Sequence, residues 1–139
     1  DKPGGWGFVI VENQRKPLGA GHSGDVCTTN NAMELMAAIR GLIAVKKKWP
    51  EGCPGVLELV SDSQYTLGMA SGRYSAQKNK DLVDQLRSLV LDLKPRLLWV
   101  KGHNGDRWNE RADQLAKVGK EKAIVAQQAA LQARLQESV

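Results

Sequence analysis

Four side chains that can hold a metal ion or transfer a proton lie at positions where such chemistry is usually found: Glu34, Asp62, His103 and Asp113. Asp62 directly follows an apolar run, residues 56–60, that predicts a strand. Side chains at such positions of an α/β sheet point into the ligand crevice. Glu34 and Asp113 lie in the first turns of predicted helices, and His103 lies in a loop bounded by glycines. These four residues are our candidates for catalysis.

Each candidate also has a purely structural explanation. Glu34 and Asp113 could complement the positive N-terminal end of a helix, Asp62 could cap a helix, and His103 could be a loop histidine. For any one of these residues, its position alone does not distinguish a catalytic role from a structural one. Whether they are catalytic must therefore be judged from the sequence that surrounds all four.

The elements that must position these residues follow from periodicity and turn signals. A capping cluster at 28–31 precedes an amphipathic helix that ends at three lysines, 46–48. The predicted order is strand, strand, helix, strand, helix, helix, strand, helix, which implies a mixed α/β sheet flanked by helices. The ranges are strands 4–12, 18–24, 56–60 and 97–100, a loop at 13–17, a short helix near 65–69, a helix at 82–93 and a last helix from about Asn109.

Composition narrows the class of protein. The chain has 139 residues and a formal net charge of +5, which fits one basic globular domain and makes a polyanionic partner plausible. No apolar run reaches the roughly 18 residues of a membrane helix, and no signal peptide is evident, so we expect no membrane association. Cys27 and Cys53 predict reduced thiols in a cytoplasmic protein.

Three long sequence words then occur in order: TTNNAMELMAAIRGL from Thr28, SDSQYTLGM from Ser61 and WVKGHNGDRWNERADQLAK from Trp99. Together with GGWGFVI from Gly4, they resemble bacterial type 1 ribonuclease H as far as about Lys117. The resemblance implies a ribonuclease H-like fold with a mixed five-stranded sheet of order 3-2-1-4-5. It also implies an endonuclease that hydrolyses the RNA strand of RNA–DNA hybrids with two divalent cations, Mg²⁺ or Mn²⁺, leaving 5′-phosphate and 3′-hydroxyl ends.

Matched by position, the resemblance implies metal ligands at Glu34, Asp62 and Asp113, and a mobile histidine at His103 that relays protons or helps product release. Carboxylate oxygens suit Mg²⁺, whereas cysteines and several histidines would indicate zinc. Asparagine and glutamine both donate and accept hydrogen bonds, as recognition of a 2′-hydroxyl requires. Ordinary capping is the alternative for one of the two asparagines. The implied contacts to the hybrid are Thr29, Asn30, Asn31 and Gln64.

The chain departs from the family pattern at its start. The resemblance implies a central first strand with a fourth metal-binding aspartate, but the sequence begins Asp1-Lys2-Pro3, and neither Asp1 nor Asp25 fits that place. We therefore expect the natural protein to have N-terminal residues that are absent here. Without that strand the sheet has a gap of about twice the ~4.8 Å strand spacing.

Two further segments are distinctive. Residues 71–80 carry only Arg73, Lys78 and Lys80 where many bacterial members have a longer basic handle, which predicts weaker hybrid binding and a shallow salt dependence. We divide the chain into a ribonuclease H domain at 1–119 and a tail at 120–139, a weakly docked or frayed helix. We expect a monomer.

Two other functions remain open. One is a catalytically impaired nucleic-acid-binding module on the same fold, which the missing aspartate favours and the retained carboxylates oppose. The other is a ribonuclease H domain cut from a larger polypeptide, such as a reverse transcriptase. The bacterial-like words argue against this second alternative.

Overall fold

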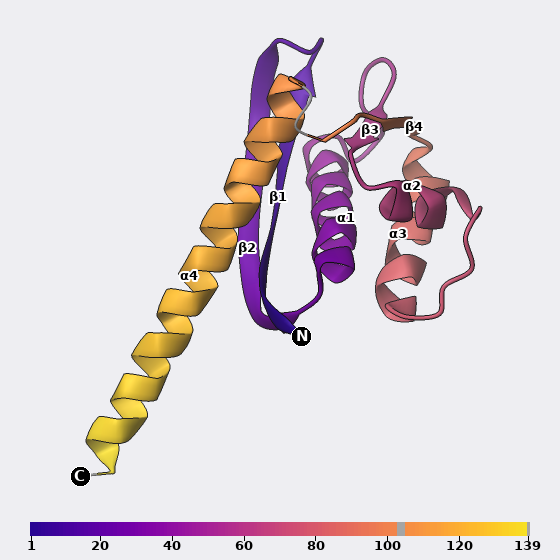
Figure 1. The fold of residues 1–139 in the computed structure, drawn as a ribbon. Helices are drawn as coiled ribbons and strands as arrows, with labels where there is room; N and C mark the ends of the chain where they lie inside the picture. Colours follow the sequence, from indigo (N-terminus) through magenta and orange to yellow (C-terminus); the bar gives the residue numbers. More distant parts are fainter. Residues whose placement is uncertain (103–104, 139) are drawn as a thin grey trace.

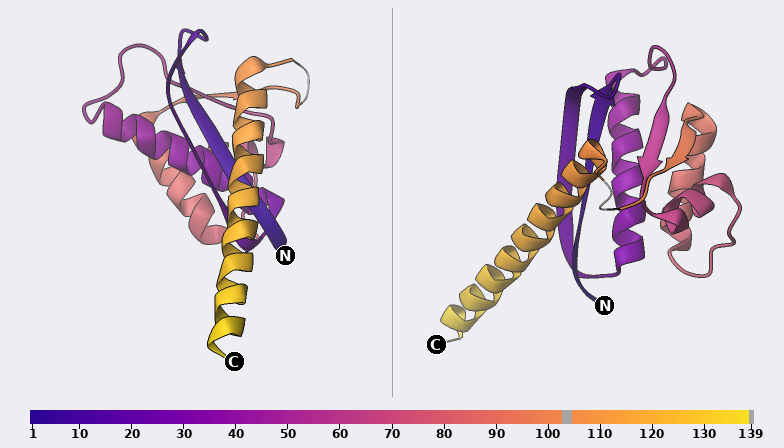
Figure 2. Two further views of the ribbon diagram at one scale, coloured as in Figure 1. Left: turned by 90° about the vertical axis from the view of Figure 1, so that its left-hand side faces the viewer. Right: turned by 45° about the horizontal axis from the view of Figure 1, so that its top comes forward.

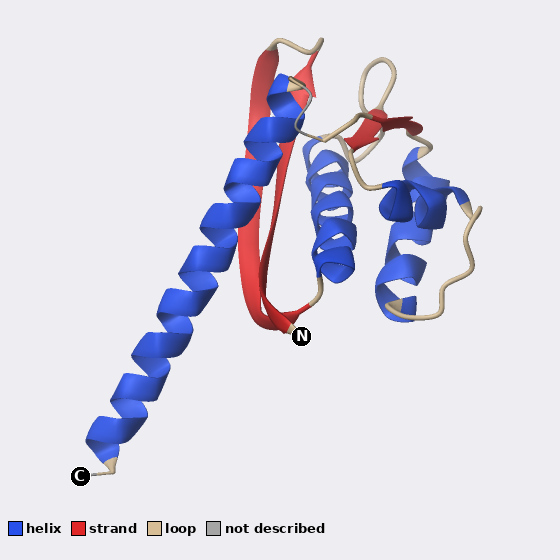
Figure 3. Ribbon diagram, in the orientation of Figure 1, coloured by secondary structure: helices blue, strands red, loops and turns tan. Residues whose placement is uncertain are grey.

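The computed structural model describes residues 1–102 and 105–138 (Figure 1). The order of strands and helices in this part of the chain agrees with the predicted one (Figure 3). The elements are β1 (Lys2–Glu12), β2 (Lys16–Thr28), α1 (Asn30–Lys48), β3 (Glu58–Ser61), α2 (Gln64–Ser71), α3 (Lys80–Leu93), β4 (Arg96–Trp99) and α4 (Arg107–Glu137).

β1 and β2 form a long antiparallel hairpin. The predicted loop at 13–17 is wrong at its end, because β2 already begins at Lys16. Asn13 and Gln14 both adopt left-handed backbone conformations, with φ of 53° and 61°, so the chain reverses within fewer residues than expected. Pro17 is accommodated where the register of the ladder shifts, opposite Val11.

The sheet is divided into two halves. β1 pairs with β2, and β3 pairs in parallel with β4, but no ladder joins β1 to β3 within the described residues. The implied five-stranded order 3-2-1-4-5 is therefore not seen as one sheet, because the described strands form two separate pairs. Helix α1 contacts both β1 and α3, and so connects the two halves (Figure 1).

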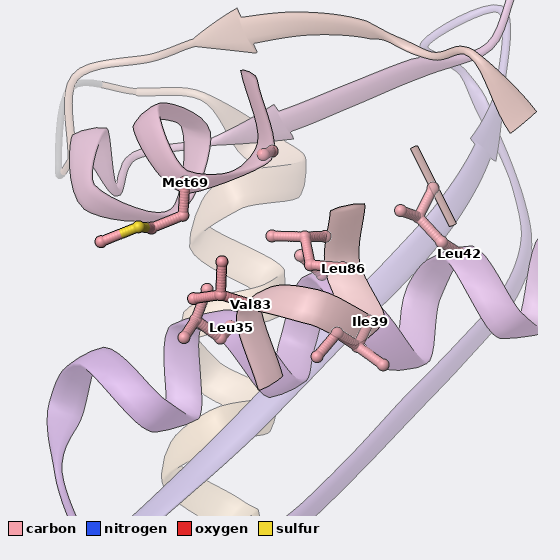
Figure 4. Close-up of a cluster of buried hydrophobic side chains, with 8 residues drawn as sticks. Leu35, Ile39, Leu42, Met69, Val83 and Leu86 are labelled. Atoms are coloured by element: carbon pink, nitrogen blue, oxygen red, sulfur yellow. The ribbon is translucent and has the colours of Figure 1, made fainter. Parts of the chain in front are cut away.

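The main hydrophobic core lies between α1, α2 and α3 (Figure 4). Leu35 and Ile39 on α1 meet Val83 and Leu86 on α3, and all four side chains are at most 1% exposed. This confirms the predicted apolar face of α1 and the amphipathic pattern of α3. Truncating one such leucine to alanine costs about 2–5 kcal/mol.

Helix α4 packs on the face of the hairpin opposite α1. Phe8 points toward Gly41 of α1, while its neighbour Gly7 faces α4, as the alternation of side chains along a strand requires. The approach is backbone to backbone. A methyl group at Gly5 would overlap the carbonyl oxygen of Ala116, and one at Gly119 would overlap that of Ser23. Glycine at these two positions is what allows the helix to lie so close.

The end of α4 projects away from the rest of the structure (Figure 2). The described residues from 125 onward are exposed, yet the helix continues without interruption to Glu137. The tail is thus helical, as predicted, and its described residues from 125 onward are exposed, whereas its start still lies against the hairpin, with Lys122 Nζ 3.3 Å from Nε2 of His22. The division at residue 119 stays a prediction. In the described residues, no helix combines the length and apolar character needed to span a bilayer.

Candidate active site

Asp62 follows the last residue of β3 and precedes α2. Ser63, and not Asp62, caps α2, because its hydroxyl accepts a hydrogen bond from the backbone N–H of Thr66 at 3.1 Å. The Asp62 carboxylate instead accepts a hydrogen bond from the side-chain amide of Asn109 at 3.2 Å. Its backbone carbonyl accepts one from the indole N–H of Trp99 at 3.1 Å. The capping explanation for Asp62 therefore fails, and its side chain is held in place by α4.

Glu34 lies on α1 beyond the first helical turn. Thr29 caps this helix, accepting a hydrogen bond from the backbone N–H of Ala32 at 3.2 Å. The pKa of Glu34 is raised from its ordinary value of 4.5 to about 7, mainly by burial and in addition by the negative charges of Asp62 and Asp113. Carboxylates from two other elements, the end of β3 and α4, therefore act on Glu34 of α1.

Asp113 lies on α4, and it is not the cap of that helix. Asp106 is the cap, accepting a hydrogen bond from the backbone N–H of Asn109 at 2.8 Å, and Glu110 is the acidic residue of the first turn. Asp113 follows Asn109 by one helical turn, so both residues lie on the same side of α4. Asp106 and Glu110, and not Asp113, therefore complement the positive N-terminal end of α4.

The predicted hybrid contacts lie at the starts of two helices next to the carboxylates. Asn30 precedes Glu34 by one turn of α1, and Gln64 follows Asp62 by two residues. Asn30, Asn31 and Gln64 are exposed, and capping accounts for Thr29 alone. His103 lies outside the described residues.

The donor chemistry of the site fits a hard divalent cation. Its ionisable groups among the described residues are carboxylates. Burial and, after it, the charges of Asp62 and Asp113 raise the pKa of Glu34, and a cation would relieve the repulsion between these charges. Within the described residues, however, no group of three or more acidic, histidine or cysteine side chains is arranged so that it could hold a metal ion. Mg²⁺ is commonly held by one or two carboxylates together with water and substrate phosphate, so an open arrangement is compatible with it.

Three residues that lie against Asp62 had no role predicted from the sequence: Trp99, Gly102 and Asn109. A side chain at Gly102 would press on the Asp62 carboxylate, with its first carbon 2.9 Å from Oδ2. All three lie within the sequence word that begins at Trp99, and their presence in this word was the only feature of the sequence that could have pointed to them. A separate hollow of about 760 Å³, between the tip of the hairpin and the start of α4, is lined by none of the predicted residues.

The chain is similar to known proteins over most of its length. Residues 1–121 match the family model described as RNase H. A ribonuclease H of Phenylobacterium zucineum is 38% identical, covering 91% of this chain and 86% of that protein. One from Pseudomonas fluorescens is 40% identical, covering 84% and 81%. The solved structure of LC11-RNase H1 in complex with an RNA/DNA hybrid has a TM-score of 0.73 at 24% identity, covering 88% of each chain, and shows the same fold.

Proposed function

Because the chain belongs to the ribonuclease H family, we propose that it hydrolyses the RNA strand of RNA–DNA hybrids. The family and its relatives make the chain a ribonuclease H and a hydrolase. The observation that carries the proposal for this chain is the mutual influence of Glu34, Asp62 and Asp113. Three carboxylates from α1, the end of β3 and α4 are gathered although none of them is needed as a helix cap.

In this proposal Glu34, Asp62 and Asp113 hold two divalent cations, Mg²⁺ or Mn²⁺. Such ions activate a water molecule and stabilise charge on the leaving O3′, giving 5′-phosphate and 3′-hydroxyl ends. Asn109 orients the Asp62 carboxylate through the bond to Oδ2. His103 moves a proton or assists product release.

In this proposal, residues at the starts of α1 and α2 select the substrate. Thr29, Asn30 and Asn31 contact the hybrid from the start of α1, where Thr29 also caps the helix. Gln64 presents both a donor and an acceptor beside Asp62. Groups of this kind can read a 2′-hydroxyl in the minor groove, which is how a protein separates RNA from DNA.

The proposal also includes a monomeric enzyme located in the cytoplasm. Cys27 and Cys53 are free thiols, which is compatible with a reducing compartment. A catalytically impaired hybrid-binding module is the second candidate. It is favoured by the absence, within the described residues, of a closed group of three metal ligands.

Cleavage of a labelled RNA–DNA hybrid in Mg²⁺, by this chain and by Asp62→Asn, tests the proposal. We expect cleavage by the parent and a loss of at least a thousandfold in the variant, several kcal/mol of transition-state stabilisation, with hybrid binding retained. Binding without cleavage by the parent would select the impaired module. Equal cleavage by both chains would remove Asp62 from the mechanism.

A further inference from the structure

The tip of the β1–β2 hairpin (residues 13–15) is bound directly to the helix that carries Asn109 and Asp113. The indole N–H of Trp108, in the first turn of α4, donates a hydrogen bond to the backbone carbonyl of Gln14 at 2.8 Å. The two residues are 94 positions apart in the sequence. Because Trp108 directly precedes Asn109, this contact fixes the chain next to a residue that binds Asp62.

Gln14 has a backbone conformation that is unfavourable for its residue type. Its φ is 61° and that of Asn13 is 53°, so both central residues of the turn are left-handed. The N–H of Arg15 closes the turn by donating to the carbonyl of Glu12 at 3.1 Å. Such a turn suits glycine and asparagine far better than glutamine, and strain of this kind points to a constraint from outside the turn. The bond from Trp108 to the carbonyl of the strained residue is such a constraint.

The hydrogen bond, more than packing, holds the side chain of Trp108 in place. The guanidinium of Arg107 lies over its ring, with Cζ 4.4 Å from the ring centroid. On the side of the hairpin, Trp108 lines the hollow of about 760 Å³ together with Pro17 and Leu18. An open hollow leaves part of the ring without neighbours, so close packing does not fix it there. The bond to Gln14 is the directional contact between the first turn of α4 and the hairpin tip.

The first turn of α4 connects this contact to the carboxylates. Further along the helix, α4 lies directly on β1, because a methyl group at Gly7 would be 2.6 Å from the carbonyl oxygen of Ala112. The turn before Ala112 extends beyond that close contact, and it is bound to the hairpin tip through Trp108 and to Asp62 through Asn109. A change in the direction of this turn therefore moves Asn109 relative to Asp62.

We propose that Trp108 is a positioning residue, whose bond to the hairpin tip sets the first turn of α4 so that Asn109 and Asp113 are correctly placed at the carboxylate site. This inference rests on the proposed function and adds to it a residue that touches neither substrate nor cation. Trp108 acts only through the helix that it anchors. Loss of the bond should therefore weaken the use of Mg²⁺ and leave binding of the hybrid unchanged.

The first test compares Trp108→Phe with Trp49→Phe. Phenylalanine keeps an aromatic ring and has no N–H. Trp49 is a matched control, because Lys48 Nζ lies 5.4 Å from its ring centroid and its indole N–H has no acceptor among the described residues. In Trp108→Phe the Mg²⁺ concentration for half-maximal cleavage should rise roughly tenfold, while KM for the hybrid stays within about twofold of the parent. Trp49→Phe should match the parent in both.

Gln14→Gly separates the backbone carbonyl from the side chain of Gln14. Glycine adopts a positive φ without strain and keeps the carbonyl that accepts the indole N–H. This variant should have the same Mg²⁺ dependence as the parent and should unfold at the same or a higher concentration of urea. A Gln14→Gly variant as impaired as Trp108→Phe would contradict a role of the carbonyl.

Nuclear magnetic resonance in EDTA gives a result that does not depend on cleavage. In Trp108→Phe the side-chain amide resonances of Asn109 should shift, while the backbone resonances of Leu35 and Leu86 in the core stay unchanged and show that the chain is folded. In the parent alone, the indole N–H of Trp108 should exchange with solvent at least about tenfold more slowly than that of Trp49. This second measurement needs no variant.

Equal exchange of the two indole N–H groups would overturn the inference. So would unchanged Asn109 resonances in Trp108→Phe, or an equal rise in the required Mg²⁺ for Trp108→Phe and Trp49→Phe. A parent that does not cut hybrids in Mg²⁺ would instead refute the proposed function. In that case the resonances of Asn109 would still decide whether Trp108 positions the start of α4.

Discussion

The side-chain amide of Asn109 donates a hydrogen bond to Oδ2 of Asp62, across 47 positions of sequence, at 3.2 Å. The backbone of Asn109 is itself fixed, because its N–H is bound by the capping carboxylate of Asp106. The start of α4 therefore orients a carboxylate that belongs to the end of β3. Asp113, one turn further along α4, is positioned by the same helix.

Replacing Asn109 with alanine should lower hybrid cleavage about tenfold at limiting Mg²⁺, because a hydrogen bond to a charged group contributes about 1.5–3 kcal/mol. The concentration of Mg²⁺ for half-maximal cleavage should rise, which a loss of stability alone would not produce. Gln114→Ala, an exposed amide on the same helix, is the control. Identical Mg²⁺ titrations for Asn109→Ala and the parent would show that Asn109 does not position Asp62.

The raised pKa of Glu34 predicts how stability depends on pH when no divalent metal is present. The folded state keeps the proton up to pH about 7, whereas the unfolded chain releases it near 4.5, so the free energy of unfolding falls as pH rises through this window. The loss is at most roughly 3 kcal/mol. Glu34→Gln removes it, so this variant should unfold at higher urea than the parent at pH 8 in EDTA, and at the same urea near pH 4.5.

Glu58→Gln is the matched control for that experiment, because Glu58 is exposed on β3. The difference between Glu34→Gln and the parent should grow between pH 4.5 and 7, while the difference for Glu58→Gln stays flat. Mg²⁺ should stabilise the parent at pH 8 more than it stabilises Glu34→Gln. A pH-independent difference would show that Glu34 is not held in its protonated form.

The close approach of α4 to the hairpin makes Gly5 sensitive to substitution. Gly5→Ala would push the methyl group into the carbonyl of Ala116, so the helix must move or the strand must bend. We expect a loss of about 1–3 kcal/mol in urea unfolding, and slower cleavage because Asp113 moves with α4. Gly19→Ala tests the hairpin itself, since the nearest atom to its new carbon is Ile10 Cδ1 at 4.0 Å. Equal effects of the two substitutions would contradict this explanation.

Removing residues 125–139 should change the free energy of unfolding by less than about 1 kcal/mol, because the described residues in this segment are exposed. Helical circular dichroism should fall, and cleavage should stay the same. In contrast, ending the chain before Ala116 removes the close contacts of Ala116 with Gly5 and of Gly119 with Ser23 and should destabilise the fold strongly. A shortened chain, lacking 125–139, that loses several kcal/mol or its activity would assign the tail a packing or binding role.

Much of the local structure could be predicted from the sequence. Leu35 and Ile39 lie four residues apart, and Leu82, Leu86 and Leu89 repeat with helical spacing, so these helices and their buried faces follow from periodicity. The capping cluster at 28–31 located the start of α1, but its four polar residues all suit a cap, and only the structure shows that Thr29 is the one. The turn at Asn13 and Gln14 was missed because left-handed asparagine and glutamine carry a weaker signal than glycine.

Residue types and spacing alone thus determined the order of elements, the family resemblance and the candidate carboxylates, since each depends on neighbours in the chain. Contacts between distant segments were decided by the tertiary structure. The bond from Asn109 to Asp62, the charge of Asp113 acting on Glu34, and the bond from Trp108 to Gln14 all depend on how α4 packs. Packing depends on shape and close approach between surfaces far apart in sequence, such as Gly5 against Ala116, and no local pattern encodes that distance.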